Sequence, residues 1–243
     1  PERGKREEIM PQVTICGAGL AGATLAHLLK HKGIDFEIYD QIKPWKCGVE
    51  PCGFGINYRS FLQICELLKL NPFKYVIRRD HFGFIDGIKV RADLATIDKP
   101  KLIFDLLEGT ERKYDKPKLS DRLIIDATGS ARAYSPAPES DFKVQTIQSR
   151  VKLSTAVSPW AHFSSSVGYA WLIPLSPSGL EVHLGAGAIK DGNLQETRGH
   201  LIERARIDIK EVICSCGAWI RATGPILPMV NRNTIAIGEA AGL

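Results

Sequence analysis

The feature that most constrains how this chain can fold is a set of three glycines near its amino terminus. Residues 13–40 read VTICGAGLAGATLAHLLKHKGIDFEIYD, and Gly17, Gly19 and Gly22 have the spacing G-x-G-x-x-G. A short apolar run precedes the glycines, a helical pattern with leucines on one face follows them, and a second apolar run ends at Asp40. A strand, a tight turn, a helix and a second strand in this order are typical of a dinucleotide-binding unit.

Each of these residues has a physical task in such a unit. Gly17 allows the sharp turn, Gly19 lets the backbone approach a pyrophosphate, and Gly22 lets the helix pack on the strand. The amino terminus of the helix offers amides and a positive dipole end to the phosphates. Asp40 follows Gly17 by 23 positions, close to the ~20 expected for the acid that binds ribose hydroxyls. This pattern does not separate FAD from NAD(P), and an ordinary βαβ unit with a glycine turn is the alternative.

Composition excludes some classes of protein. The chain has 243 residues, 44% of them hydrophobic and 24% charged, which suffices for one large or two modest folded domains. The net charge of +5 comes without a cluster of Lys and Arg interleaved with aromatic residues, so we expect no nucleic-acid partner. We see no signal peptide and no apolar segment of ~20 residues, and therefore expect a cytoplasmic protein, with peripheral membrane contact left open.

The spacing of the six cysteines does not favour a metal site. We expect Cys16 and Cys65 to be core residues, because they lie in an apolar strand and an apparent helix. Cys47 and Cys52 have the spacing C-x4-C, and Cys214 and Cys216 the spacing C-x-C. Neither is the usual C-x-x-C pair of a zinc knuckle, although a shared metal site and a Cys47–Cys52 disulfide both stay open.

The rest of the chain predicts a mixed α/β fold. Helical spacing covers residues 58–70, 100–107 and 193–205, and short strand-like runs lie at 75–77, 82–85 and 88–90. From residue 142 to about 188, alternating runs separated by Ser, Pro and Gly predict an antiparallel sheet. The sequence ends with a strand over 234–237 and a glycine-containing segment.

Two further glycine motifs follow the first in a fixed order. Residues 123–129 read LIIDATG and residues 236–242 read AIGEAAG. With GAGLAG and Asp40, and with Lys46-Cys47-Gly48, this set resembles the FAD-dependent oxidoreductases of the p-hydroxybenzoate hydroxylase-like fold. Within that group it is similar to the geranylgeranyl reductase family, which includes archaeal enzymes that saturate isoprenoid chains of membrane lipids. A further element, Tyr169 to Pro174 (YAWLIP) followed by Gly185-Ala186-Gly187, resembles the motif that lines the lipid pocket of these reductases.

The resemblance implies a set of site residues. The residues it assigns to FAD are Gly17, Ala18, Gly19, Leu20, Ala21, Gly22, Asp40, Gly48, Asp126, Ala127, Gly129, Gly238, Glu239, Ala240 and Gly242. It assigns Tyr169, Trp171 and Pro174 to the substrate, and a role in proton delivery to Cys47 as the catalytic residue.

The resemblance also implies an architecture. A Rossmann-like FAD-binding domain of residues 10–141 and 228–243 would hold an inserted substrate domain, mainly antiparallel sheet, over residues 142–227. The chain departs from the pattern at Glu239, where Asp is usual, at Ile173 in place of Phe, and at Lys99 in place of Arg. Relatives continue past the position of Leu243, so we expect a C-terminal part of the fold to be missing.

The function implied is reduction of a carbon–carbon double bond in a prenyl chain by reduced FAD. We interpret Gly185 and Gly187 as a turn, not a second nucleotide site, so the electron donor is either NAD(P)H or a small electron carrier. Two alternatives stay open. One is another flavoenzyme of this fold, either a hydroxylase or a quinone-linked dehydrogenase, and the other is a non-catalytic protein that binds flavin or lipid.

Overall fold

The chain folds into two compact units. The structure is a computed structural model, and it describes residues 12–41, 53–117, 119, 122–157, 160–165, 168–189 and 192–242. One unit, the parallel-sheet unit, comprises Pro1–Ile42, Asp105–Glu139 and Gly224–Leu243; the other, the antiparallel-sheet unit, comprises Lys43–Phe104 and Ser140–Thr223. Within the part of the chain that the structure describes, no helix is both long enough and apolar enough to span a membrane.

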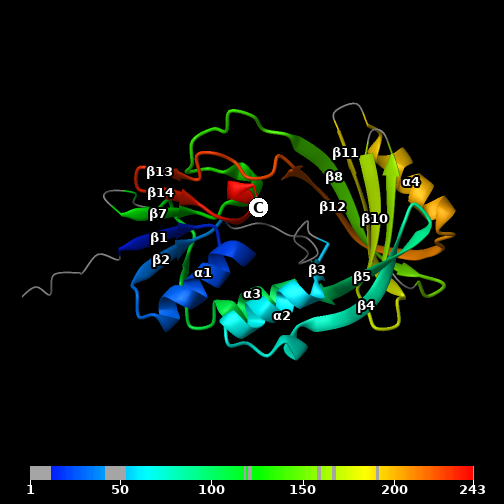
Figure 1. Cartoon of the computed structure of the whole chain (residues 1–243), viewed down its shortest axis with the longest axis horizontal. Coiled ribbons are helices and arrows are strands. Elements are labelled where there is room, and N and C mark those ends of the chain that lie inside the picture. Colours follow the sequence, from blue (N-terminus) through cyan, green and yellow to red (C-terminus); the bar gives the residue numbers. More distant parts are fainter. Residues whose placement is uncertain are drawn as a thin grey trace, which may run out of the picture. The chain divides into compact units, whose positions relative to one another are not determined.

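The parallel-sheet unit is built around a six-stranded sheet in the order β13-β14-β7-β1-β2-β6 (Figure 1). Its elements are β1 (Val13–Cys16), α1 (Leu20–His31), β2 (Phe36–Tyr39), β6 (Arg112–Lys113), β7 (Leu123–Asp126), η2 (Gly129–Ala131), β13 (Val230–Asn231), β14 (Thr234–Ala236) and η3 (Gly238–Ala241). All pairs are parallel except β13 with β14. The carboxyl ends of the parallel strands therefore meet at one edge of the sheet.

Apolar side chains hold α1 on this sheet. Ile15 and Ile38, in the middle of neighbouring strands, are 0% and 1% exposed, and Ala23 and Ala26 on α1 are both fully buried. Small alanines on the buried face bring the helix close to the strands, because no long side chain separates the two backbones. The predicted strand, turn, helix and strand are confirmed.

The antiparallel-sheet unit is built around an eight-stranded sheet in the order β12-β8-β11-β10-β9-β4-β5-β3. Its elements are β3 (Gly55–Asn57), α2 (Tyr58–Leu67), η1 (Pro72–Lys74), β4 (Val76–Ile85), β5 (Ile88–Ile97), β8 (Lys143–Leu153), β9 (Trp160–Ser165), β10 (Gly168–Pro174), β11 (Glu181–Ala188), α4 (Leu194–Arg204) and β12 (Ile209–Arg221). The boundary between the two units falls inside α3 (Lys99–Leu106). With both sheets in place, the expected α/β fold class is confirmed.

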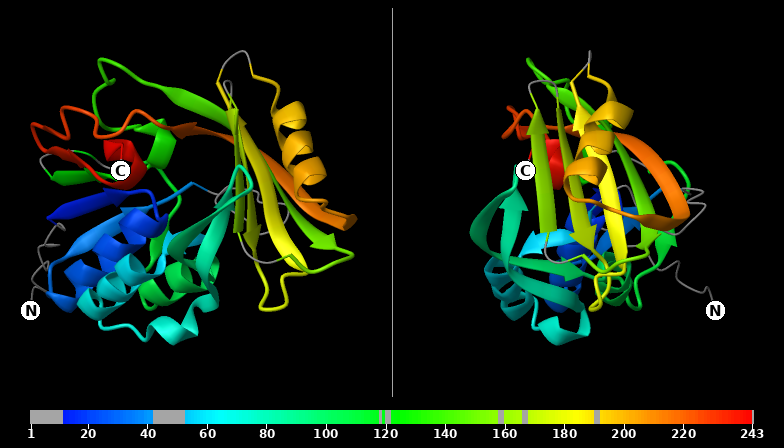
Figure 2. Two further views of the ribbon diagram at one scale, coloured as in Figure 1. Left: turned by 45° about the vertical axis from the view of Figure 1, so that its right-hand side comes forward. Right: turned by 90° about the vertical axis from the view of Figure 1, so that its right-hand side faces the viewer.

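Helix α4 covers one face of this sheet (Figure 2). The core between them consists of alternate residues of the strands, joined by Leu201 of α4 and by Ile207; the strand residues are Val151, Leu153, Ala170, Leu172, Val182, Leu184 and Ala186. The residues between them, with period two, therefore lie on the opposite face of the sheet. We call that second face the open face.

The compact units differ from the division expected from the sequence. Residues 53–104 were expected to belong with the parallel sheet, but they belong to the antiparallel-sheet unit. The reason is strand pairing: β5 pairs with β3 and β4, and β4 pairs with β9 through Gly83 and Trp160. The short runs expected at 75–77, 82–85 and 88–90 are parts of the long hairpin β4–β5, in which charged residues interrupt the apolar pattern.

The packing makes a prediction about the core. We expect Leu184→Ala, at a side chain that is 0% exposed, to lower the free energy of unfolding by about 2–5 kcal/mol. Leu180→Ala is the matched control, since Leu180 is 42% exposed at the entry to the same strand, and it should cost about 1 kcal/mol or less. Urea denaturation of both variants measures the difference, and equal losses would contradict this account of the core.

Candidate functional site

The turn after β1 is fixed by the backbone of a neighbouring strand. Gly17 has φ +106°, and a Cβ at this position would lie 2.3 Å from the carbonyl oxygen of Ala127. Its amide donates to the Tyr39 carbonyl (2.7 Å), and the Ala127 amide donates to the Cys16 carbonyl (2.8 Å). No side chain fits at Gly17, because β1 here runs directly beside the ends of β2 and β7.

The other two glycines of the motif have opposite surroundings. A Cβ on Gly22 would lie 1.9 Å from the Gly17 carbonyl oxygen, so Gly22 allows helix and turn to touch. A Cβ on Gly19 would meet no atom of the described residues within 4 Å. Gly19 is the N-cap of α1, no side chain caps this helix, and its first turn carries no acidic residue. The backbone at Gly19 therefore borders open space at a helix amino terminus.

The helix start also leaves backbone amides without acceptors inside the helix. The first hydrogen bond within the helix runs from the Ala23 amide to the Gly19 carbonyl (2.9 Å). The amides of Leu20, Ala21 and Gly22 come before it and have no acceptor inside the helix. Ala18 is buried beside them, at 4% exposure. This arrangement of donors suits an anionic group such as a phosphate.

Asp40 lies where a ribose-binding acid is expected, directly after β2. Its amide donates to the Lys113 carbonyl (2.9 Å), and its carboxylate accepts from the Gln41 amide (2.9 Å). The side chain is partly exposed to solvent. Because Tyr39 bonds to Gly17, Asp40 lies at the same edge of the sheet as the glycine turn.

Asp126, expected to bind cofactor, is fully buried and already surrounded by donors. Its carboxylate accepts from the Thr128 hydroxyl (2.6 Å) and from the amides of Thr128 (3.2 Å), Tyr134 (3.0 Å) and Ser135 (2.8 Å). Burial raises the pKa of the Asp126 carboxyl, but the hydrogen bonds from Thr128 and Ser135 outweigh burial and leave the pKa below its ordinary value. Asp126 therefore organises the loop that follows β7.

The same loop carries a buried arginine that the sequence analysis did not identify. Arg132, with φ +46° and 5% exposure, donates to three backbone carbonyls, those of Pro136 (2.8 Å), Pro228 (2.8 Å) and Ala240. A guanidinium presents its N–H groups in a planar fork, so one side chain can bond to several segments. Arg132 fastens the loop after β7 to η3 and to the segment before β13.

The third glycine motif is held against the first two. Gly238 has φ +58°, and its Cβ would lie 2.7 Å from the Cβ of Ala21 at the start of α1. A Cβ on Gly129 would lie 3.4 Å from Oε2 of Glu239. Ala240 and Ala241 are buried, and Gly242 contacts the Gly224 backbone. The partly exposed Glu239 therefore lies beside Gly129, at the edge that also carries the helix start.

The structure thus brings three distant motifs to one edge of the parallel sheet. The residues of GAGLAG, Asp40, Ala127, Gly129, Gly238 and Glu239 all lie there. Cys47 and Gly48, and also Cys52, lie outside the described residues. Cys16 and Cys65 are 1% exposed, as expected of core residues, and burial together with the Asp126 charge raises the pKa of the Cys16 thiol to about 12. Among the described side chains, no three His, Cys, Asp or Glu residues are grouped as metal ligands would be.

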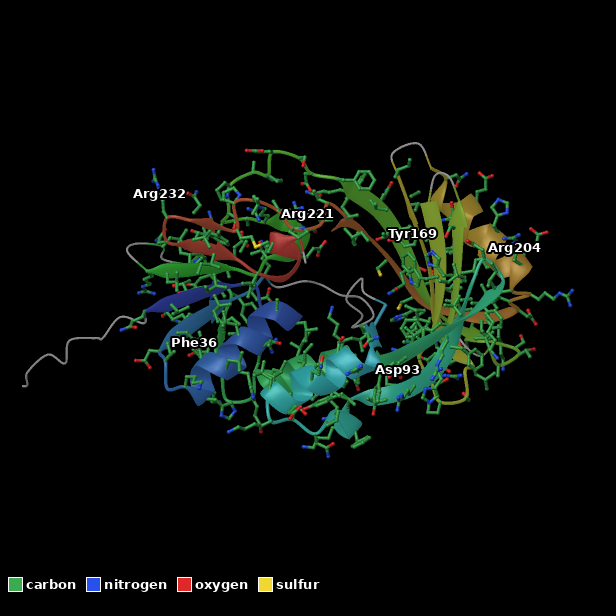
Figure 3. All side chains as sticks on the ribbon, viewed as in Figure 1. Phe36, Asp93, Tyr169, Arg204, Arg221 and Arg232 are labelled. Atoms are coloured by element: carbon green, nitrogen blue, oxygen red, sulfur yellow. The ribbon has the colours of Figure 1, made fainter. Side chains whose placement is uncertain are left out.

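A second cluster lies on the open face of the antiparallel-sheet unit. Tyr169, labelled in Figure 3, and Trp171 both come from β10, with ring centroids 5.5 Å apart. A Cβ on Gly185 would lie 2.3 Å from the Trp171 ring, and a Cβ on Gly187 would lie 2.8 Å from the Tyr169 ring. The interpretation of these glycines as a turn is wrong: both lie inside β11, where the absence of side chains makes room for the rings.

Polar residues accompany this aromatic pair. Trp171 Nε1 donates to Gln148 Oε1 (3.2 Å), and the His162 ring stacks on Tyr169 at 5.7 Å between centroids. Burial lowers the pKa of His162, which favours the neutral ring. The sequence analysis missed Gln148 and His162, although their alternation along β8 and β9 is a signal that could have found them.

Two other residues of this region, Pro174 and His183, are not exposed on the open face. Pro174 is buried and has the same parity in β10 as Ala170 and Leu172, which puts it on the α4 side of the sheet. His183 is on the open face but is fully buried under the Phe54 ring, 5.0 Å away. Burial lowers the pKa of His183 to about 4, and the nearby Gly53 backbone opposes this only in part.

Comparison with known proteins places the fold. No family model matches this sequence, and no curated protein matches it at a significant level. A geranylgeranyl bacteriochlorophyll reductase-like protein from Thermoplasma acidophilum has 14% identity and a TM-score of 0.74, over 96% of this chain and 71% of that one. The p-nitrophenol 4-monooxygenase PnpA from Pseudomonas putida has 12% identity and a TM-score of 0.70, over 96% and 73%.

A third similar structure was determined as a complex with FAD. Klebsiella pneumoniae HpxO carrying the substitution R204Q, in complex with FAD, has 15% identity and a TM-score of 0.64, over 96% of this chain and 74% of that one. At these identities the similarity concerns the fold. The chain has the fold of FAD-dependent oxidoreductases, which reductase-like proteins and hydroxylating enzymes share.

The arginine contacts predict a large effect on stability. We expect Arg132→Ala to lower the free energy of unfolding by about 3 kcal/mol, because the carbonyls of three separate segments, one of them buried, lose a charged donor. Arg232→Ala is the control, since Arg232 also has a left-handed backbone (φ +52°) in the same unit but is exposed. Chemical denaturation compares them, and a loss at Arg132 no larger than at Arg232 would show that the contacts are dispensable.

Proposed function

We propose that this protein binds FAD at the carboxyl edge of its parallel sheet. The observation that carries the proposal is the open space at Gly19, bordered by the first amides of α1. A pyrophosphate there would accept from the amides of Leu20 and Ala21 and lie at the positive end of the helix dipole. The Asp40 carboxylate would accept from hydroxyls of the adenosine ribose.

Glu239 fits the second half of the same cofactor. Its carboxylate lies next to Gly129, on the segment that Arg132 holds, and in a position to accept hydrogen bonds from ribityl hydroxyls. The donor set therefore matches a molecule with a phosphate centre and hydroxyl groups on both sides of it, as in FAD. NAD(P) also has a central pyrophosphate, so the identity of the bound cofactor is what the first experiment must establish.

The glycines provide a matched pair of variants for that experiment. We expect Gly19→Ala to fold with wild-type stability, since its methyl group meets no atom of the described part of the chain, but to bind FAD at least about tenfold more weakly. Gly22→Ala should instead destabilise the fold, because its methyl group meets the Gly17 carbonyl.

Absorbance of the purified protein, identification of the released cofactor and FAD titration measure the affinities, and denaturation measures the stabilities. A wild-type protein that neither contains nor takes up FAD would overturn the proposal. So would a Gly19→Ala variant that binds FAD as well as the wild type.

We propose further that the reaction is reduction of a carbon–carbon double bond in a prenyl chain. Reduced FAD supplies the hydride in such chemistry. The residues of this chain would bind the apolar substrate and exclude water, with the rings of Tyr169 and Trp171 contacting the prenyl chain over Gly185 and Gly187. Burial favours the neutral form of His162, and the indole N–H of Trp171 is paired with Gln148, so these two polar groups add no charge beside the rings.

The second carbon of the double bond must receive a proton. Cys47 is the candidate donor by resemblance to the reductases, and NAD(P)H or a small electron carrier would supply the electrons. The proposed substrate is a prenyl lipid of the geranylgeranyl type.

Two tryptophans on opposite faces of the antiparallel sheet allow a test of the substrate surface. We expect Trp171→Ala to lower kcat/KM for a geranylgeranyl lipid about tenfold, because the prenyl chain loses an aromatic contact, while FAD affinity stays unchanged. Trp219→Ala is the control, since Trp219 is 51% exposed on β12. The assay is anaerobic reduction with dithionite, followed by mass spectrometry for gain of hydrogen.

Two results would contradict the proposed reaction. One is an FAD-loaded protein that leaves prenyl chains unchanged but consumes oxygen with NAD(P)H when an aromatic substrate is added, which indicates a hydroxylase. The other is equal loss of activity in Trp171→Ala and Trp219→Ala.

A further inference from the structure

Four large apolar side chains protrude into solvent from α2, η1 and α3. Ile64 and Leu67 on α2 are 41% and 68% exposed, Phe73 on η1 is 76% exposed, and Phe104 on α3 is 71% exposed. Lys69, Lys74 and Lys101 lie among them in the sequence, and all three are exposed. We call these seven residues the apolar–basic patch.

The backbone holds the first part of this patch in a defined shape. The Leu70 amide donates to the Cys65 carbonyl (2.8 Å), and the Lys69 amide donates to the Glu66 carbonyl (3.1 Å), which turns the chain at the end of α2. Asn71 then caps η1 by accepting from the Phe73 amide (3.1 Å). Leu67 and Phe73 therefore project from a hydrogen-bonded turn.

Helix α3 adjoins the same turn. The Asp98 amide donates to the Tyr75 carbonyl (2.7 Å), and Lys101 Nζ lies 6.0 Å from the centre of the Tyr75 ring. Phe104 follows Lys101 by three positions, so both side chains lie on one face of α3. Residues Lys99–Phe104 of α3 belong to the antiparallel-sheet unit, as α2 does.

The burial pattern separates these residues from the core. On α2, Phe61 and Cys65 are each 1% exposed, and on α3 Leu102 is 3% exposed, so both helices already have a buried face. The exposed apolar groups are additional to the packing that stabilises the unit. Exposed apolar surface rimmed by polar residues is typical of a surface that binds a partner or a membrane.

We propose that the apolar–basic patch docks the protein on an anionic lipid bilayer. The charge along these elements favours an anionic occupant: three exposed lysines lie among the apolar residues in the sequence, against the exposed Glu66 and the partly exposed Asp105. Apolar groups that enter the boundary of the acyl chains, flanked by lysines that reach the phosphates, are the combination that binds peripheral proteins to such membranes. This inference goes beyond the proposed reaction and does not depend on it.

Vesicle flotation with the full chain tests this proposal. We expect binding to vesicles of phosphatidylglycerol and phosphatidylcholine in equal parts to be at least about tenfold tighter than to phosphatidylcholine alone, and to weaken with salt. Changing Leu67→Ser together with Phe73→Ser should weaken binding at least about tenfold. Changing Lys69→Gln together with Lys74→Gln should weaken it about tenfold, on anionic vesicles only.

Matched controls carry the same changes elsewhere in the antiparallel-sheet unit. Ile88→Ser removes an apolar side chain that is 69% exposed in the β4–β5 hairpin, and Lys210→Gln removes an exposed lysine on β12; both should bind vesicles as the wild type does. Thermal unfolding confirms that all variants are folded. FAD absorbance is recorded separately, so a failure of membrane binding and a failure of FAD binding are told apart.

Three outcomes would overturn the membrane proposal. The wild-type protein could fail to float with anionic vesicles, or the patch variants could float as well as the controls. The third is a wild-type protein that self-associates through the patch, detected by sedimentation, without binding vesicles.

Discussion

The carboxyl edge of the parallel sheet depends on one buried anion, the carboxylate of Asp126. A carboxylate without partners in an apolar interior would cost many kcal/mol, so its burial demands donors. Three of its four donors are backbone amides of residues 128–135, which forces the loop after β7 to fold back onto the strand end. That fold places Arg132 where it can bind the carbonyls of Pro228 and Ala240. The buried Asp126 carboxylate thus positions the Arg132 guanidinium, which in turn holds η3.

The three glycine motifs form a site only when contacts between them hold them together. Backbone hydrogen bonds connect Ala127 to Cys16 and Ile237 to Asp126, so the middle motif links the first motif to the last. Steric fit does the same where Gly238 meets Ala21. Segments separated by more than half of the chain must therefore be in register before the helix start and Glu239 lie at one edge.

Sequence reasoning succeeded where sterics are local and failed where they are tertiary. The need for glycine at Gly22 follows from its own turn, whose Gly17 carbonyl it meets, but the role of Asp126 depends on amides that its spacing does not reveal. Gly185 and Gly187 follow a strand-like run without a third glycine at the offset of a nucleotide motif, which is the reason for the interpretation as a turn; the rings that require them come from another strand. Strand β12 was not predicted because register shifts near Glu211 and Cys214 interrupt its alternation.

In strand β11, the residues that pack the core and the residues that make room for the aromatic rings lie on opposite faces. On one face, Leu184 and Ala186 belong to the core under α4; on the other, Gly185 and Gly187 leave the depth of a side chain for the rings of the neighbouring strand. The shape of the open face therefore depends on residues that contribute nothing to the core. Along this strand, selection for a new ligand can proceed through the odd-numbered positions while the even-numbered positions preserve folding.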